Sequence, residues 1–174
     1  MKKIVWVNGI IGGVIVAVMM LISMLWFKNS EHMEWGMVYG YTSMIIAFSF
    51  IFVAIKTYRD KYNNGQVGFG KAFTIGLFIT LIASTFYVVT WLFCYYNIVP
   101  DFAEQYGKSM VKKLAESGAS ANAIAKKKIE MVQFGEMYKN PLINAMFTYI
   151  EIIPVGLIIS LIASLILKRK KGAD

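Results

Sequence analysis

The chain has 174 residues, of which 57% are hydrophobic and 16% are charged, and it carries a net charge of +8. A typical soluble domain is roughly 45–50% apolar and 25% charged, so this composition is typical of a membrane protein. The basic residues cluster beside apolar runs instead of forming a basic and aromatic face, which argues against nucleic-acid binding, and a single cysteine excludes an intrachain disulfide or a thiolate metal cluster.

Four apolar segments are long enough to cross a bilayer, which takes about 20 residues. We expect spans at roughly 4–27, 35–55, 72–96 and 142–167. The first begins MKKIVW, but its apolar run is too long for a signal peptide and no small-x-small cleavage site follows it. The sequence therefore predicts an all-α membrane protein, residues 1–174 forming a single integral membrane domain with four transmembrane helices in a compact bundle.

Each predicted span carries small residues four positions apart, and such residues let helices approach closely in lipid. Because all four spans carry such a set, the sequence favours a compact bundle. The sets are Gly9, Gly13 and Ala17; Gly36 and Gly40; Ala72, Gly76, Thr80 and Ser84; and Gly156, Ser160 and Ser164.

The basic residues beside the spans predict the topology. Lys2 and Lys3 precede the first span, the connection 56–71 contains four Lys or Arg residues, and KRKK follows the last span at 168–171. Positive residues in short segments beside spans stay in the cytoplasm. With four spans both termini lie on one side, so we expect a multi-pass protein of the cell inner membrane with both termini cytoplasmic.

The connection between the third and fourth spans is too polar to cross the membrane but is strongly patterned. Its apolar residues recur every four positions, which is typical of one helical stripe. Gly118 suits a helix C-terminal cap and Ser120 the next N-cap. An extracytoplasmic amphipathic helical hairpin is therefore predicted at about 101–138. The first stripe is Phe102, Tyr106, Met110 and Leu114.

Local signals also bound this hairpin. Asp101 and Glu104 have the spacing of a capping box, and Asn140-Pro141 ends the second helix and begins the fourth span. The apolar face of the hairpin must be buried, against the bilayer surface, the ends of the spans or a partner protein.

The sequence GQVGFGKA at 65–72 matches a phosphate-binding loop except at its last position. That position needs Ser or Thr to hold magnesium, and the chain has Ala72. No buried strand precedes the loop in the sequence, so we expect a tight connection before the third span, and no cofactor or metal site.

Glu151 is an acid within the fourth predicted span. Seventeen residues separate it from Lys168, which at about 1.5 Å per residue places it near the outer edge of a core about 30 Å thick. Residues at similar depth suggest a polar cluster in which Glu151 either stabilises the bundle or couples to a proton or cation. The candidate cluster is Glu151, Asn144, Thr148, Tyr41, Thr42, Tyr87 and Thr90. Trp91 and other aromatic residues near span ends are expected to anchor the chain at the interface.

The shortage of nucleophile, base and metal-ligand groups favours a non-enzymatic accessory or interaction protein. The expected partners are the lipid bilayer and a membrane-protein partner or a second copy of the chain, with no nucleic acid. The alternative is a subunit of a small oligomeric transporter or channel that uses Glu151.

Short motifs are spread over nearly the whole chain: YRD (58–60), GFGKAFTIG (68–76), PDFAEQY (100–106), SGAS (117–120), NPL (140–142) and the ending SLIASLILKRKK. In these motifs the chain resembles a bacterial membrane family known as domain-of-unknown-function family 4199. The resemblance implies four spans with a helical insertion before the last, and it supplies no activity, ligand or catalytic residue.

Overall fold

The computed structural model describes residues 1–27 and 35–169, so the predicted connection 28–34 and the last two residues of KRKK lie outside the described residues. Within these ranges every regular element is helical, which confirms the predicted all-α class. The elements are α1 (Lys2–Phe27), α2 (Trp35–Phe48), α3 (Phe50–Thr57), the π-helical turn η1 (Tyr58–Tyr62), α4 (Phe69–Asn97), α5 (Phe102–Glu116), α6 (Ala121–Tyr138) and α7 (Pro141–Leu167).

Four helical segments are long and apolar enough to cross a membrane, as predicted: Lys2–Trp26, Val38–Tyr62, Phe69–Asn97 and Pro141–Leu167. The second is longer than the predicted 35–55, because α3 and η1 continue the rod begun by α2. Ser49 interrupts this rod: its hydroxyl donates to the Ile46 carbonyl at 2.6 Å. A serine that bonds back to a preceding carbonyl bends a helix.

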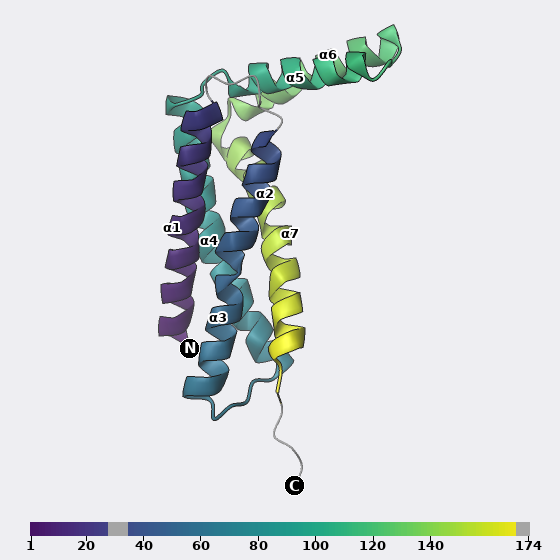
Figure 1. Ribbon diagram of the computed structural model, residues 1–174. Coiled ribbons are helices and arrows are strands. Elements are labelled where there is room, and N and C mark those ends of the chain that lie inside the picture. The colour runs from purple at the N-terminus through teal and green to yellow at the C-terminus, as the bar shows by residue number, and fades with distance from the viewer. Residues whose placement is uncertain (28–34, 170–174) are drawn as a thin grey trace.

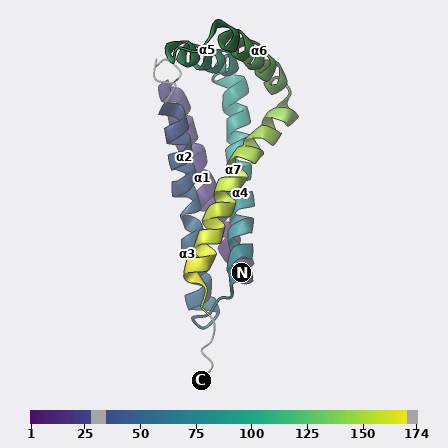
Figure 2. The same ribbon diagram turned by 90° about the vertical axis from the view of Figure 1, so that its right-hand side faces the viewer.

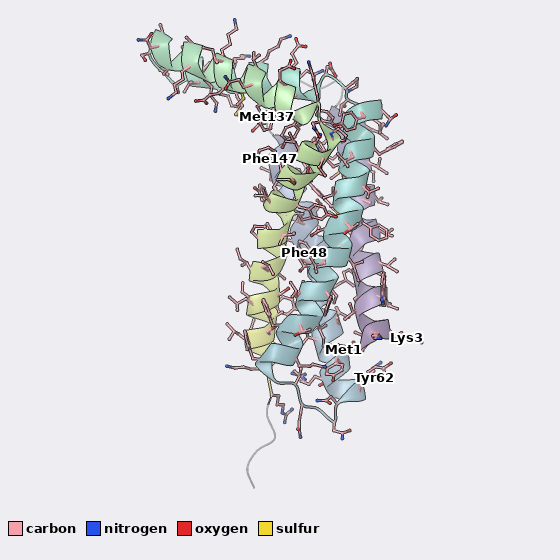
Figure 3. All side chains as sticks on the ribbon, turned by 180° about the vertical axis from the view of Figure 1, so that it is seen from behind. Met1, Lys3, Phe48, Tyr62, Met137 and Phe147 are labelled. Carbon is pink, nitrogen blue, oxygen red and sulfur yellow. The ribbon has the colours of Figure 1, made fainter. Side chains whose placement is uncertain are left out.

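The long helices stand side by side, with α4 packed along both α1 and α7 (Figure 1). The start of α1 and the end of α7 lie at one end of the bundle, the terminus end, whereas α5 and α6 lie across the opposite end, the hairpin end, and extend beyond α7 (Figure 1). Figure 3 places Phe48 midway along the bundle, Met1, Lys3 and Tyr62 at the terminus end, and Met137 and Phe147 where the hairpin joins α7.

Most of the predicted small-residue contacts are present. A Cβ atom on Gly13 would lie 2.7 Å from the Phe86 ring, and one on Gly76 would lie 2.6 Å from the Ser160 hydroxyl. A Cβ atom on Gly156 would lie 2.9 Å from Phe48 Cζ. These glycines are therefore required for close approach of α1 and α7 to their neighbours.

Gly36 and Gly40 differ from the other small residues. A Cβ atom on either residue would meet nothing within 4 Å, so at these two positions α2 makes no close contact with a described helix. Figure 2 shows the reason: α7 lies close to α3 at the terminus end but leans away from α2 toward the hairpin end. Spacing along one helix does not encode the tilt of its neighbour.

The turn of the hairpin follows the predicted caps. Gly118 has φ +78°, the left-handed conformation that favours glycine. The amides of Gly118 and Ala119 donate to the carbonyls of Ala115 and Leu114, at 3.1 and 3.4 Å, which is the Schellman pattern. The Ser120 hydroxyl then accepts from the Ala123 amide at 3.3 Å and caps α6.

The predicted capping box at Asp101 was wrong. Asp101 has φ −92° and ψ 9°, outside the extended region that an N-cap normally adopts, and its side chain makes no capping bond. Its carboxylate instead accepts from the Gln105 side chain. At the other end of the hairpin, α7 begins at Pro141 as predicted, and Asn140 caps it by accepting from the Leu142 amide at 2.9 Å.

The terminus end is closed by contacts between the loop before α4 and the residues after α7. Val67 and Arg169 exchange two backbone hydrogen bonds of 2.9 and 2.8 Å, and Arg59 donates to the Leu167 carbonyl at 3.4 Å. The loop runs directly into α4 with extended backbone at Gly68. It therefore has the geometry of a short connection, as the sequence predicts.

Candidate functional site

The hairpin end contains a cavity of about 370 Å³, and seven of its fifteen lining residues are aromatic. Contributions come from α1, α2, α4 and α7, and α5 and α6 form its roof. Because Gly36 and Gly40 present no side chain here, the wall on α2 is thin. This space is called the cavity below. It is lined by Ser23, Met24, Gly36, Gly40, Tyr41, Tyr87, Trp91, Val99, Phe102, Gln105, Tyr106, Phe134, Tyr138, Thr148 and Glu151.

A hydrogen-bond network centred on Asn144 fixes the back of the cavity. Asn144 is fully buried, and its side-chain oxygen accepts from Trp91 Nε1 at 2.8 Å. The Thr148 hydroxyl donates to the Asn144 backbone carbonyl at 2.8 Å, while the Asn144 amide donates to the Tyr138 carbonyl at 3.5 Å. One asparagine thus links α4, α6 and α7, and its buried polar atoms are satisfied.

The roof is built from aromatic pairs. Trp91 meets Phe102 edge to face, with ring centroids 5.0 Å apart, and Phe102 stacks on Tyr106 at 5.9 Å. Phe134 and Tyr138 on α6 lie 4.1 Å apart. Tyr138 also pairs with Phe147 of α7 at 5.8 Å. Such pairs are favourable beyond the area they bury, so the contacts of Phe102 with α4 and of Tyr138 with α7 help to attach the hairpin to the bundle.

Glu151 lies on the cavity wall with an exposed side chain. Its carboxylate makes no hydrogen bond or ion pair with any residue in the described ranges. Burial, and next the charge of Glu151, raise the pKa of the Tyr138 phenol to about 12. The charge of Glu151 therefore acts on the roof, and no described residue forms an ion pair with it.

The structure distributes the seven residues of the predicted polar cluster over three environments. Glu151, Thr148, Tyr41 and Tyr87 line the cavity, and Asn144 lies behind Thr148. Thr42 is exposed and donates to the Val38 carbonyl at 2.7 Å, and Thr90 is half-buried and not part of the lining.

Sequence reasoning missed the aromatic walls. Trp91 was expected at the membrane interface, but it is 9% exposed and hydrogen-bonded to Asn144 within the core. The apolar stripe of α5 was a usable signal, since Phe102 and Tyr106 belong to it. The stripe does not indicate which surface of the bundle it packs against, because that surface is formed by residues far away in the chain.

The hairpin carries a second concavity, a groove of about 980 Å³ between α5 and α6. Its α5 and α6 residues are entirely different from those that roof the cavity, so the groove opens on another face of the hairpin. Across residues 1–27 and 35–169, no three His, Cys, Asp or Glu side chains come together to hold a metal ion. The groove is lined by Tyr95, Tyr96, Pro100, Ala103, Glu104, Gly107, Lys108, Val111, Lys112, Ala115, Ile124, Lys128, Met131, Val132, Gly135, Glu136 and Lys139.

The four apolar rods and the capped cavity define an α-helical, multi-pass membrane protein. The profile of a family described as "Protein of unknown function (DUF4199)" matches residues 8–169, nearly the whole chain. The chain belongs to this family, as the motif resemblance suggested. Comparison with curated proteins gave no match, and comparison with solved structures gave none either.

Proposed function

We propose that this chain is a non-enzymatic accessory protein of the bacterial inner membrane, in which the bundle holds the hairpin in place to dock a helical segment of another membrane protein. The groove between α5 and α6 is the observation that carries this proposal. A third amphipathic helix laid into such a groove is a common mode of recognition.

The sparse packing of the hairpin supports the proposal that another protein segment covers it. Gly107 is the only buried residue that the described structure gives to α5, and α6 has none. Met131 and Val111 line the groove and are half-buried, and Val132 is 62% exposed. A helix pair with so little core gains stability when another apolar face covers it.

The charges around the groove indicate what the partner segment carries. Three of the lysines that line the groove are paired: Lys108 with Glu104 at 2.6 Å, Lys112 with Glu116 at 3.8 Å and Lys139 with Glu136 at 2.7 Å. Lys128 also lines the groove and has no ion pair within the described residues. An amphipathic helix with an acidic residue opposite Lys128 complements this surface.

The proposed orientation places both termini in the cytoplasm and the hairpin outside it. Its support is the basic cluster at the terminus end, since positive residues beside spans stay cytoplasmic. In a Cys94→Ser background, a thiol from Ser117→Cys should react with an impermeant reagent in intact spheroplasts, and one from Asn64→Cys should not. Labelling of the Asn64→Cys protein from outside contradicts this orientation.

The docking proposal is tested by a photo-crosslinking amino acid at Val132, inside the groove, with Ile129 as control. Ile129 is equally exposed, at 61%, but does not line the groove. Position 132 should give one discrete adduct with a membrane protein, lost on Lys128→Glu, whereas position 129 should not. The same adduct from both positions, or none from Val132, overturns the proposal; an adduct of twice the chain mass assigns the groove to a second copy and overturns the hetero-partner.

Transport is the second candidate, and the observation that favours it is the acid on the cavity wall. Against it, the bundle is sealed below the cavity: Ile51, Ile75 and Ile79 are fully buried, and the Thr80 and Ser160 hydroxyls are 3.3 Å apart. A pH-dependent flux in proteoliposomes that Glu151→Gln abolishes would favour transport over docking.

A further inference from the structure

Beyond the docking role, we propose that the cavity beneath the hairpin binds an alkylammonium group, its charged nitrogen lying between the Glu151 carboxylate and the faces of the surrounding aromatic rings. The groove and the cavity lie on different faces of the hairpin, so this site does not depend on a protein partner.

The charges of the lining favour a cation. Glu151 is the only charged residue among the described residues that line the cavity, and no lysine, arginine or histidine accompanies it. Its carboxylate has no ion pair or hydrogen bond within the described part of the chain. Because the Glu151 side chain is exposed, its charge is tolerated without a partner, and a cation that enters the cavity would supply one.

The rings supply the rest of the recognition. Cations are attracted to the faces of Trp, Tyr and Phe within about 6 Å of the ring centre, and aromatic cages of this kind select quaternary ammonium groups. Trp91 is held in place by its bond to Asn144, so the ring is preorganised. The other rings of the cavity are Tyr41, Tyr87, Phe102, Tyr106, Phe134 and Tyr138.

The size and ligand set select an organic cation over a metal ion. A volume of about 370 Å³ falls in the range of about 300–1,000 Å³ usual for small-molecule sites. Calcium takes about 6–8 oxygen ligands, which one carboxylate with a few hydroxyl and amide groups does not provide. Beside Gly36 and Gly40 the α2 wall carries no side chain, which leaves room for an apolar tail.

Two sources offer this chemistry at the hairpin end of a membrane span. One is the ammonium headgroup of phosphatidylethanolamine in the surrounding leaflet, whose acyl chains stay in the bilayer. The other is a free hydrophobic ammonium compound that enters from the bilayer. Both place a cation beside Glu151, and competition between them separates the two.

The direct test titrates benzyltrimethylammonium into the full chain in a maltoside detergent. Trp6, Trp26 and Trp35 are replaced by Phe, so that the fluorescence of Trp91 reports on the cavity wall. Saturable quenching is expected with benzyltrimethylammonium and not with neopentylbenzene, which has the same shape without the charge. Equal binding of the neutral compound, or no saturable change with the cation, overturns the proposal.

Matched variants locate the site. Glu151→Gln should weaken binding by about tenfold or more, since it removes the negative charge that faces the cation. Gly40→Leu should abolish binding by filling the cavity, and it should fold, because nothing lies within 4 Å of its Cβ position. Glu130→Gln, on an exposed acid of α6 outside the cavity, should leave the affinity within about twofold. Unchanged affinity in either Glu151→Gln or Gly40→Leu, with melting temperature retained, overturns the site.

The source is assigned by adding short-chain phosphatidylethanolamine or short-chain phosphatidylglycerol to the same titration. Competition by the ethanolamine lipid alone supports the site with a lipid headgroup as its occupant. Competition by neither lipid supports the site with a free ammonium compound. Equal competition by both lipids shows that acyl chains, and not ammonium groups, are recognised, which overturns the proposal.

Discussion

The two ends of the bundle are packed on different principles. At the terminus end and in the middle, the interior is filled: Phe48, Ile51 and Ile75 are at most 1% exposed, and glycines on α4 and α7 sit against neighbouring side chains. At the hairpin end, the same four rods surround a cavity of about 370 Å³ closed by aromatic rings.

The glycines at the two ends have different neighbours. Gly156 lets α7 approach α4, whereas Gly40 faces open space because α7 leans away from α2 (Figure 2). A small residue in a span therefore permits either close contact or a cavity. Which one results depends on the direction of the neighbouring helix.

The sharpest contrast between the two ends is the pair Gly156→Ala and Gly40→Ala. The first places a Cβ atom against Thr80 and Phe48, so it should lower the free energy of unfolding by about 1–3 kcal/mol. The second meets nothing within 4 Å and should be neutral or stabilise by up to about 1 kcal/mol. Unfolding in mixed micelles measures both. Equal losses would show that the two ends are packed alike.

The next effect concerns the bond that ties the cavity wall to α7. Trp91→Phe leaves the Asn144 oxygen with only the longer, 3.5 Å bond from the Thr148 hydroxyl, and Asn144→Leu removes the acceptor. A double-mutant cycle should give a coupling energy of about 0.6 kcal/mol, the average for hydrogen bonds between membrane helices, and at most about 1.7 kcal/mol. Additive losses would mean that this bond does not hold α4 to α7.

A smaller gain is expected at Ser84 on α4. Its hydroxyl is buried and finds no hydrogen-bond partner among the described residues. Ser84→Ala removes this unsatisfied group, so thermal unfolding should show equal stability or a gain of up to about 1 kcal/mol. Thr80→Ala is the control, since the Thr80 hydroxyl contacts Ser160 and its loss should destabilise. A clear loss in Ser84→Ala would reveal a partner for this hydroxyl.

The smallest effect is expected at Glu151. Because its carboxylate has no hydrogen bond within the described residues, Glu151→Gln should change the free energy of unfolding by no more than about 0.5 kcal/mol. A loss of several times this size would contradict a free carboxylate on the cavity wall and would favour a structural role.

The sequence predicted much of the architecture. Apolar length located four spans, and the four-residue stripe located the hairpin, because both signals are local. The caps at Gly118, Ser120 and Asn140 were also predictable, since each depends on a few adjacent residues. The capping box predicted at Asp101 is absent because the backbone of Asp101 belongs to the turn that follows α4. In this turn the Phe102 amide donates to the Val99 carbonyl at 3.0 Å.

The cavity was only partly predictable. The sequence placed Glu151, Thr148 and Tyr87 at a similar depth in the membrane, since the rise per residue of a helix converts sequence position into depth. The tilt of α7 and the pairing of Trp91 with Asn144, 53 positions apart, depend on packing between distant segments. Local spacing carries no information on either, so the aromatic walls and the role of Gly40 emerged only in three dimensions.

The difference between a hollow hairpin end and a sealed remainder is tested most directly by thiol accessibility in a Cys94→Ser background. Gly40→Cys places a thiol in the cavity wall, and Ala54→Cys places one where the native side chain is 0% exposed. With 2-aminoethyl methanethiosulfonate, Gly40→Cys should react in the folded protein and be slowed by benzyltrimethylammonium, while Ala54→Cys should react only after denaturation in SDS. Equal reactivity at the two positions, or an unreactive Gly40→Cys, would contradict this account.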